Sequence, residues 1–499
     1  MKYSSTRNKS KTVSGAEAIV KGISPEGGLF VPEVFPKIGK AELLELCELS
    51  YAERAAYICA HFLPELKDEL AGFCEKAYAQ FEDADPAPLV RIDEGLYLLE
   101  LWHGPTSAFK DVALTLLPYL LTGSKRVLGD NSETLILVAT SGDTGKAALE
   151  GFKDVPGTQV IVLFPEDGVS ELQKLQMQTS AGKNVKVFGI KGNFDDAQNA
   201  VKAIFADESV VEELKKYGVV LSSANSINFG RLLPQIVYYF SAYADLVNGK
   251  QIVFGEKINF CVPTGNFGNI LAGYYALRMG LPVHKLICAS NRNNVLTDFI
   301  RGGEYSANRE FFKTASPSMD ILISSNLERL IFELSGRDDK VTADRMAELK
   351  KDGKYCITDD ERDALCEIFW GGYADEEACM TALGDTFDEY GYIADPHTAV
   401  ALAVHAEYLA ETGDSAKTVV LSTASPYKFV GDVLEAIGEE RSSSERKNLV
   451  VLEEATALPI PDSLSGLFQL PRLHTEVLEK TGARAAVLKY AAGSKGKTE

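Results

Sequence analysis

Short apolar runs of β-type residues alternate with helical stretches over most of this chain, and this alternation restricts its fold more than any other feature. Most residues in each run are apolar, as in parallel strands that helices cover on both faces of a sheet. The clearest of them are residues 134–139, 159–164, 257–262, 285–289 and 418–422. The pattern predicts an α/β protein with layered parallel sheets.

The chain's 499 residues are too many for one small core, so several domains are expected. Between Lys40 and Glu82, apolar residues recur at helical spacing, which sets the first part of the chain apart. A cluster of Asp and Pro at 82–88 then marks a boundary. We expect an N-terminal domain over 1–95, a two-lobed core over 96–440 and a C-terminal extension over 441–499 that packs on the core and ends in a frayed tail.

The charge balance is strongly acidic, with a net charge of −20 and a pI of about 4.9. Such a chain repels phosphate backbones and anionic lipids, so we expect neither nucleic acid nor a membrane as a partner. No apolar run reaches the roughly 18 residues that a membrane helix needs. The eight cysteines form no CxxC pair and are interpreted as reduced thiols. These features favour a cytoplasmic protein.

Lys110 ends the segment Glu100-Leu-Trp-His-Gly-Pro-Thr-Ser-Ala-Phe-Lys110, in which a Gly-Pro turn precedes an apolar helical stretch. The lysine is therefore expected near a helix start, in apolar surroundings. Burial and the positive end of a helix both lower the pKa of a lysine, and only the neutral amine attacks a carbonyl carbon. The alternative is an ordinary surface lysine whose charged end reaches solvent.

Two segments follow predicted strands and open helices. They are Thr140-Ser-Gly-Asp-Thr-Gly145, before a helical stretch over 146–152, and Thr264-Gly-Asn-Phe-Gly-Asn269. Small residues at a helix start let backbone N–H groups bind an anion. Neither segment matches a Walker loop or GxGxxG, so a nucleotide is not indicated. The second is the better candidate for a phosphate cradle, and the first could be a plain strand-to-helix turn.

Two more segments carry polar side chains at element ends. Ser223-Ala-Asn-Ser-Ile-Asn-Phe-Gly-Arg231 places amide and hydroxyl groups before an arginine, whose fork suits phosphate or carboxylate. A capped helix start with a surface arginine is the alternative. Leu421-Ser-Thr-Ala-Ser-Pro-Tyr-Lys-Phe429 runs from a strand end into hydroxyl groups.

In their order and spacing, these segments resemble the fold-type-II pyridoxal-phosphate enzymes, and among them the long-type threonine synthases. The resemblance covers nearly the whole chain. It includes Tyr3-Ser-Ser-Thr-Arg7, Ser325-Asn-Leu-Glu-Arg329 and Asp395-Pro-His-Thr-Ala-Val400. It implies an α/β, two-lobed parallel-sheet core of the tryptophan-synthase-β-like type, with an added N-terminal domain. Pyridoxal 5'-phosphate would be bound within the catalytic core, residues 96–440.

The resemblance also implies a role for each candidate residue. Lys110 would hold the cofactor as a Schiff base and then move protons, Asp143 would meet its ring hydroxyl, and Thr423 would meet its pyridine nitrogen. The cofactor phosphate would be held by Gly265, Asn266, Phe267, Gly268 and Asn269. The substrate would be bound by Ser141, Thr144, Asn225, Ser226 and Arg231, with Thr144, Ser226 and Arg231 on its phosphate group. No metal is expected.

The implied reaction converts O-phospho-L-homoserine and water to L-threonine and phosphate, in a monomer or a homodimer. A serine/threonine dehydratase or another fold-type-II lyase is an alternative, but it would not need a second phosphate site. A relative that binds a phosphorylated amino acid without catalysis would lack the lysine. The sequence departs from the family at Ser425, which is usually His, and at Asn269, which is often Asp.

Overall fold

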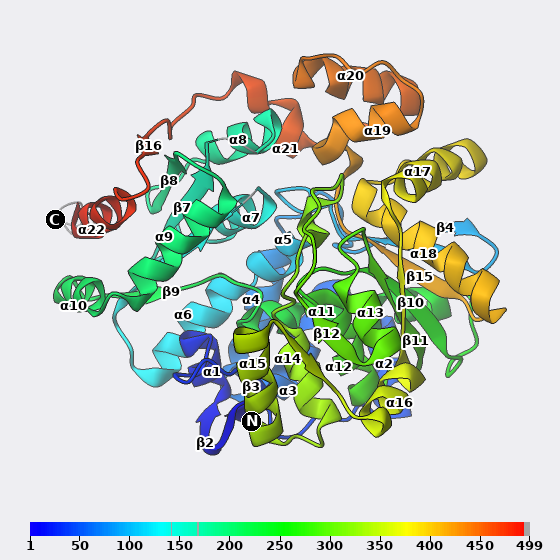
Figure 1. Cartoon of the computed structure of the whole chain (residues 1–499), viewed down its shortest axis with the longest axis horizontal. Helices are drawn as coiled ribbons and strands as arrows, with labels where there is room; N and C mark the ends of the chain where they lie inside the picture. The colour runs from blue at the N-terminus through cyan, green and yellow to red at the C-terminus, as the bar shows by residue number, and fades with distance from the viewer. Residues whose placement is uncertain (141, 167–168, 494–499) are drawn as a thin grey trace.

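The computed structural model describes residues 1–140, 142–166 and 169–493, and its core contains two sheets flanked by helices (Figure 1). The tail residues 494–499 and the predicted site residue Ser141 lie outside the described residues. The larger sheet occupies the right half of Figure 1 and the smaller one the left half. The α/β class and the parallel-sheet core predicted from the sequence are confirmed.

The larger sheet has six strands in the order β14-β11-β10-β15-β5-β4. Its neighbours are parallel, except that β4 runs antiparallel to β5. All residues of the central strands β10 and β15 are buried, as expected of apolar runs covered on both faces. The strands are β4 (Leu89–Asp93), β5 (Leu96–Glu100), β10 (Ile258–Pro263), β11 (Val283–Ser290), β14 (Phe369–Tyr373) and β15 (Thr418–Ser422).

The smaller sheet has five parallel strands in the order β16-β8-β7-β6-β9. The C-terminal segment supplies β16, which pairs with β8 at the edge of the sheet. The strands are β6 (Glu133–Ala139), β7 (Thr158–Pro165), β8 (Val185–Ile190), β9 (Val219–Ser222) and β16 (Val477–Leu478). Together the two sheets contain all the apolar runs predicted as strands, which confirms that part of the prediction.

The N-terminal region forms a three-stranded antiparallel sheet and a group of helices at the bottom of Figure 1. The Tyr3 hydroxyl donates a hydrogen bond to the Phe62 carbonyl at 3.0 Å, and the Tyr3 ring packs edge-on against Phe229 of α11. This region therefore packs against the helix that carries Arg231. Its elements are β1 (Lys2–Ser5), β2 (Asn8–Ser14), α1 (Gly15–Lys21), β3 (Phe30–Pro32), α2 (Lys40–Glu48), α3 (Tyr51–Phe62), η1 (Pro64–Leu66) and α4 (Lys67–Tyr78).

Several of the helices between residues 110 and 279 contribute residues to the site described below. They are α5 (Lys110–Leu114), α6 (Leu117–Leu128), α7 (Asp143–Gly151), α8 (Glu171–Gln178), α9 (Phe194–Ala206), α10 (Glu208–Lys216), α11 (Phe229–Asn248) and α12 (Gly268–Met279). Helix α7 begins at Asp143, earlier than the predicted 146, because Gly142 takes a conformation (φ 156°) that ends the strand connection and lets the helix start at once.

The rest of the chain after α12 is largely helical. Its elements are α13 (Val295–Gly302), β12 (Glu304–Ser306), η2 (Pro317–Met319), α14 (Leu327–Leu334), α15 (Asp339–Asp352), β13 (Lys354–Cys356), α16 (Asp359–Ile368), α17 (Glu376–Tyr390), α18 (Pro396–Thr412), η3 (Pro426–Phe429), α19 (Val430–Ala436), α20 (Glu445–Thr456), α21 (Asp462–Ser465), η4 (Leu467–Gln469) and α22 (Ala483–Gly493). Strands β12 and β13 form a separate antiparallel pair.

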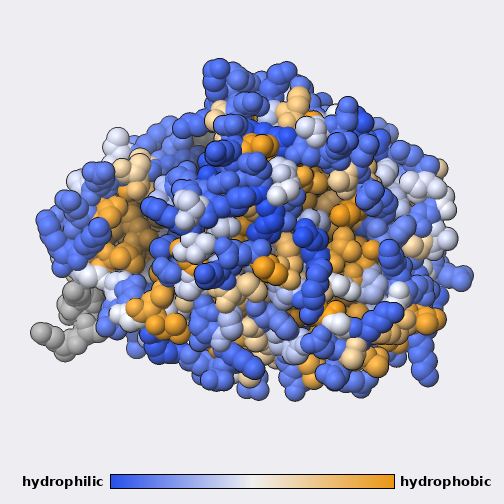
Figure 2. Space-filling view, turned by 90° about the horizontal axis from the view of Figure 1, so that it is seen from below, coloured by the Kyte–Doolittle hydropathy of each residue, from blue (hydrophilic) through white to orange (hydrophobic). Residues whose placement is uncertain are grey.

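Hydrophilic residues dominate the face seen in Figure 2, and apolar residues show through only in small groups. Within the described part of the chain, no helix combines the length and the apolar character that crossing a bilayer requires. The cysteines in that part are all free, and only Cys356 and Cys366 are exposed.

Candidate active site

One cavity brings together residues from connections that follow strands of both sheets and from the start of α11. Each candidate residue predicted from the sequence lines it except two: Ser141 lies outside the described residues, and Asp143 reaches the cavity only through a contact with Lys110. The lining residues are Phe109, Lys110, Thr144, Asn225, Ser226, Arg231, Gln235, Pro263, Thr264, Gly265, Asn266, Phe267, Gly268, Asn269, Ser318, Met319, His397 and Thr423.

Lys110 is the first residue of α5, and its amine points into this cavity. The amine nitrogen Nζ lies 3.5 Å from Oδ2 of Asp143 and 3.2 Å from Oγ of Ser318. Burial lowers the pKa of the Lys110 amine, although the Asp143 carboxylate partly opposes that shift. The structure thus places a lysine with a depressed pKa at a helix start, as the sequence predicted, but its amine faces polar and charged groups and not the apolar surroundings expected.

Asp143 lies between two lysines. Its Oδ1 is 2.7 Å from Nζ of Lys428, a side chain with no exposed surface, and its Oδ2 faces Lys110. Burial alone would raise the pKa of Asp143, but the positive charges of Lys428 and Lys110 hold it well below its usual range. Asp143 is therefore a carboxylate at neutral pH, and its charge keeps both lysines in place.

The turn before α5 is fixed by a second buried carboxylate. Asp111 accepts hydrogen bonds from the Thr106 backbone N–H (2.8 Å) and from the Thr106 hydroxyl (2.6 Å). Lys428 donates to the Thr106 carbonyl at 2.9 Å, so the same lysine holds both this turn and Asp143. A Cβ at Gly104 would come within 2.5 Å of Asp111 Cβ, which explains the glycine. These contacts determine where Lys110 enters the cavity.

The loop from Gly265 to Asn269 leads from β10 into α12 and presents no charged side chain. Phe267 has a left-handed backbone (φ 63°), which is unusual for a non-glycine residue and common at functional sites. The Asn269 Oδ1 accepts hydrogen bonds from the hydroxyls of Tyr238 (2.5 Å) and Tyr239 (2.9 Å). Its Nδ2 is buried and has no partner among the described residues. A helix start with a free amide donor suits an anion such as a phosphate.

Arg231 lies in the first turn of α11 and is buried. Its Nη1 donates to the Ala224 carbonyl at 2.5 Å, while its Nε has no partner among the described residues. Burial lowers the pKa of the Arg231 guanidinium to about 10, so it remains charged at neutral pH. No carboxylate in the described part of the chain forms an ion pair with it. The Asn228 side chain caps α11 by accepting a hydrogen bond from the Gly230 N–H, so the helix start is capped as one interpretation of the sequence expected. The same interpretation expected a surface arginine, whereas Arg231 is buried.

Thr423 follows β15 and lies beside Phe109, whose backbone N–H donates to the Thr423 carbonyl at 2.8 Å. The Thr423 side chain is buried and lines the cavity. Ser425 has no exposed surface, and its hydroxyl has no partner among the described residues. Its backbone N–H donates to the Ser107 carbonyl at 3.0 Å, so the segment 423–425 joins the turn that carries Lys110.

Several residues at this site were not predicted from the sequence. Ser318 belongs to a loop without a recognisable motif, so no local signal could have identified it. His397 and Lys428 lie in segments that took part in the family resemblance, Asp395–Val400 and 421–429, but neither received a role. Their ionisable side chains were the available signal, because an ionisable group inside a strand-end or helix-start motif is a candidate site residue.

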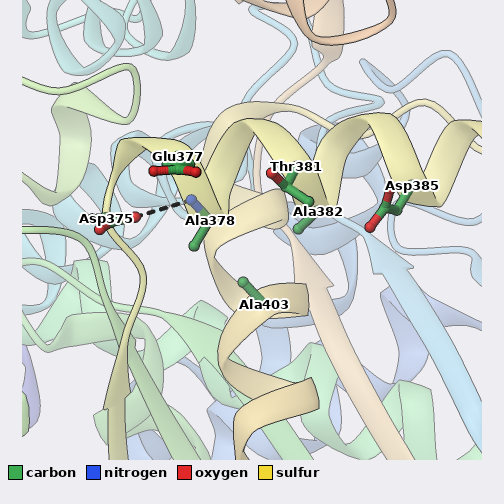
Figure 3. Close-up of a pocket in the computed structure, with 7 residues that line it drawn as sticks. All are labelled: Asp375, Glu377, Ala378, Thr381, Ala382, Asp385 and Ala403. Carbon is green, nitrogen blue, oxygen red and sulfur yellow. Dashed lines mark hydrogen bonds between the residues drawn. The ribbon is translucent and has the colours of Figure 1, made fainter.

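A second hollow lies on the surface between α17 and α18 (Figure 3). Figure 3 shows Asp375 at the helix start, where its Oδ1 accepts the Ala378 N–H at 2.9 Å. The hollow is shallow, and its lining offers carboxylates and methyl groups but no basic side chain. It is lined by Asp375, Glu377, Ala378, Thr381, Ala382, Asp385 and Ala403. Its chemistry marks a solvated helix face, so the candidate active site is the cavity around Lys110.

Models of protein families match the chain along most of its length. The description "Threonine synthase N terminus" matches residues 2–78, "Pyridoxal-phosphate dependent enzyme" matches 82–352, and "Threonine synthase, C-terminal" matches 398–487. The second of these covers more than half of the chain and contains Lys110 and the loop 265–269.

Among curated proteins, the chain is similar to human "Threonine synthase-like 1", with 39% identity over 93% of this chain. That match covers 62% of the human protein, so the chain spans less than two thirds of its length. The chain is also 36% identical to the threonine synthase of Saccharomyces cerevisiae, over 90% of this chain and 91% of the yeast protein. The threonine synthase of Pseudomonas aeruginosa is 38% identical over 86% and 89%, respectively.

Solved structures show the same similarity across the whole chain. A pyridoxal-phosphate-bound threonine synthase from Brucella melitensis has a TM-score of 0.88 and 36% identity, and the match covers 99% of both chains. The yeast threonine synthase has a TM-score of 0.89 and 33% identity, again over 99% of both. The cavity fits the pyridoxal phosphate of the Brucella melitensis structure: a lysine amine could bind an aldehyde, the uncharged loop with its free Asn269 amide could hold a phosphate, and Thr423 could meet a ring nitrogen.

Proposed function

Because this chain belongs to the threonine synthase family of pyridoxal-phosphate-dependent enzymes, we propose that it converts O-phospho-L-homoserine and water to L-threonine and phosphate. Pyridoxal phosphate is its cofactor. When bound, the cofactor withdraws the electron pair left on the substrate when a proton departs. The remaining work of the reaction falls to the protein's own side chains.

One observation carries this proposal: Arg231 is a buried guanidinium that lacks a carboxylate partner among the described residues and lines the cavity of Lys110. A buried charge without a partner is costly, so such a site is built for an anion that arrives from outside. The cofactor phosphate already has a separate loop at 265–269. A second anion is what distinguishes a phosphorylated substrate from an unphosphorylated amino acid.

The two anion sites stand at the starts of two helices that pack together, α11 and α12. Helix starts carry partial positive charge and free backbone N–H groups, which favour phosphate. Ser226 and Asn225 precede α11 and Thr144 lies in the first turn of α7, and all three face the cavity. We assign the substrate phosphate to Arg231, Ser226 and Thr144, and the cofactor phosphate to the start of α12.

Lys110 is assigned the proton transfers. Its depressed pKa lets the released amine act as a base toward the substrate Cα–H. Asp143 then balances the positive charge that the lysine acquires. Arg231 counters the charge that grows on the departing phosphate, which speeds its loss from Cγ. Thr423 is assigned to the ring nitrogen, where a neutral hydroxyl does not force protonation as a carboxylate would.

Phosphate release from O-phospho-L-homoserine, measured in the parent and in Arg231→Ala, tests the proposal. A hydrogen bond to a charged group contributes about 1.5–3 kcal/mol, so we expect kcat/KM to fall at least about 10- to 150-fold. Arg231→Lys should recover little, because an ammonium lacks the planar fork. Cofactor content should not change. Arg441→Ala, which removes an exposed arginine that does not line the cavity, is the matched control.

Other outcomes would favour the alternatives. Loss of cofactor in Arg231→Ala would place this arginine on the cofactor phosphate instead. Conversion of serine or threonine to a keto acid, at rates that Arg231→Ala leaves unchanged, would support a dehydratase. Binding of phosphohomoserine without any turnover by the parent would support a non-catalytic phospho-amino-acid binding protein.

A further inference from the structure

The loop between β12 and α14 brings a hydroxyl to the reacting amine. Ser318 lies in the short helix η2 of this loop and lines the cavity. Its Oγ is 3.2 Å from Nζ of Lys110, which is closer than the 3.5 Å between that nitrogen and the Asp143 carboxylate. The nearest polar contact of Lys110 is thus with a neutral group from a segment that no motif identifies.

A buried histidine holds Ser318 from one side. His397 Nε2 is 3.2 Å from the Ser318 backbone nitrogen and accepts its N–H. His397 Nδ1 is 2.7 Å from Oδ1 of Asp395, a carboxylate with no exposed surface, so Nδ1 carries the proton and Nε2 is free to accept. The ring of Phe429 packs edge-on against the imidazole at 4.9 Å. His397 therefore has one orientation and one tautomer.

Other contacts hold the loop at further points. Asp320, two residues after Ser318, accepts hydrogen bonds from the amide groups of Asn291 (2.8 Å) and Asn293 (3.0 Å). A Cβ at Gly265 would lie 2.6 Å from the Ser318 carbonyl oxygen, so the loop packs directly on the cofactor-phosphate segment. Because these supports are backbone or buried groups, the Ser318 hydroxyl is held near Lys110 by the fold and not by its own side-chain contact.

Charged groups already surround the Lys110 amine, and Ser318 is the neutral group that contacts it. Asp143 of α7 is the carboxylate beside it, and Lys428 of η3 and Arg231 of α11 are the nearby positive charges. A second carboxylate would keep the amine protonated, and a further cation would repel the ammonium that forms. A hydroxyl can accept an N–H from either form of the amine, and it favours the ammonium less than a carboxylate does.

We infer that Ser318 is a further catalytic residue of this enzyme and that His397 is the residue that positions it. The inference rests on the proposed role of Lys110. The Ser318 oxygen accepts one N–H of the released amine, which turns the nitrogen lone pair toward the substrate. When the proton leaves Cα and bonds to Nζ, Ser318 keeps its acceptor role and neither gains nor loses a proton. The hydroxyl orients the base and then supports the ammonium.

The first test is Ser318→Ala in the holoenzyme, with phosphohomoserine as substrate. We expect kcat to fall about 10- to 100-fold, with KM changed less than about threefold. This loss is smaller than the roughly 100- to 10,000-fold typical of groups that transfer the proton themselves, because Ser318 only orients the base. Ser318→Thr keeps a hydroxyl and should recover most of the rate. Ser306→Ala, at the strand that leads into the same loop, is the matched control and should behave like the parent. Equal rates in Ser318→Ala and Ser306→Ala would overturn the inference.

The second test measures the lysine itself and does not depend on turnover. The apoenzyme is treated with an amine-directed acylating reagent over a range of pH, and modification of the Lys110 peptide is followed by mass spectrometry. Loss of an acceptor disfavours the ammonium, so Ser318→Ala should lower the midpoint pH by roughly half to one unit. His397→Gln should shift it in the same direction by less. An unchanged midpoint in Ser318→Ala would mean that the hydroxyl does not contact the amine.

Borohydride reduction of the holoenzyme separates this inference from the proposed function. If the cofactor is trapped on the Lys110 peptide in the parent and in Ser318→Ala alike, the role of Lys110 stands and the two tests above decide the role of Ser318. If it is trapped on another lysine, the proposed assignment of Lys110 fails, and the contact with Ser318 loses its catalytic meaning with it.

Discussion

Two strand-to-helix connections face the same cavity and solve different chemical problems. The connection from β10 to α12 is uncharged and offers an anion a helix start and the amide of Asn269. The connection from β6 to α7 begins its helix with Asp143, a carboxylate that two lysines hold in its ionised form. Both follow parallel strands and both are rich in glycine. The shared strand-to-helix topology therefore places both connections at the cavity. Whether a connection binds an anion or holds lysine side chains depends on the charge of its own residues.

The largest effect is expected for Lys110, whose amine contacts Asp143 of the charged connection. In Lys110→Ala, turnover of phosphohomoserine should fall by at least about 1000-fold, because the base and the covalent attachment point are lost together. The uncharged connection is intact, so the protein should still bind the cofactor reversibly through its phosphate. Phosphate release and cofactor retention on gel filtration measure the two effects. Retained turnover would show that another amine takes part.

Asp143→Asn should remove the negative charge from the β6–α7 connection and leave the β10–α12 connection unchanged. The change leaves Lys428 buried without its carboxylate, which typically costs about 3–5 kcal/mol. Urea unfolding of the apoenzyme measures this cost. Asp143→Asn combined with Lys428→Met should recover part of it, because the uncompensated charge is then gone. If the single and double variants are equally unstable, the ion pair does not explain the stability.

The same variant has a defined pH dependence. The neighbouring lysines lower the pKa of Asp143 in the folded protein, so its stabilising contribution is complete above the ordinary Asp pKa of about 4. It is lost as the pH falls toward the lower, folded-state pKa. Asp143→Asn should therefore differ most from the parent at neutral pH and converge with it in acid. A difference that stays constant from neutral pH to acid would contradict this.

Gly265→Ala should perturb the uncharged connection without adding a charge. The new Cβ would lie 2.6 Å from a backbone oxygen, that of Ser318, so the loop must shift. Strain of this kind costs about 1–3 kcal/mol, which corresponds to roughly 5- to 150-fold weaker cofactor binding. Gly72→Ala is the control, since nothing lies within 4 Å of the Cβ position there. Equal cofactor affinity in both variants would mean that the loop does not hold the cofactor phosphate.

Thr423→Val should give the smallest effect, since it keeps the shape of the side chain and removes only a hydroxyl. A buried polar group left without its partner costs about 1–3 kcal/mol, and water could offset part of this cost. We expect cofactor affinity to fall about tenfold and the rate to fall modestly, with the fold unchanged. Equilibrium titration of the apoenzyme with the cofactor checks the affinity. An unchanged affinity would assign the ring nitrogen to another residue.

The sequence by itself determined the two sheets and the glycine-rich connections. Runs such as 135–139 and 260–262 are apolar at successive positions, a pattern typical of strands buried on both faces. The sequence also indicated Lys110, Arg231 and the loop 265–269 as candidates, because each lies in a local segment whose residue types suit a site. The local pattern left a surface lysine and a surface arginine open as alternatives, and the family resemblance supplied the roles.

Only the tertiary structure decided how the side chains meet. Ser318 and His397 come from distant parts of the chain. The contact of Ser318 with Lys110 and that of His397 with Ser318 depend on the packing of the β12–α14 loop against α18. Likewise, Lys428 follows Asp143 by 285 residues in the sequence, yet the two side chains form a buried ion pair. Burial and neighbouring charge set the ionisation of such groups, and both are properties of the folded chain, which no local stretch of sequence contains.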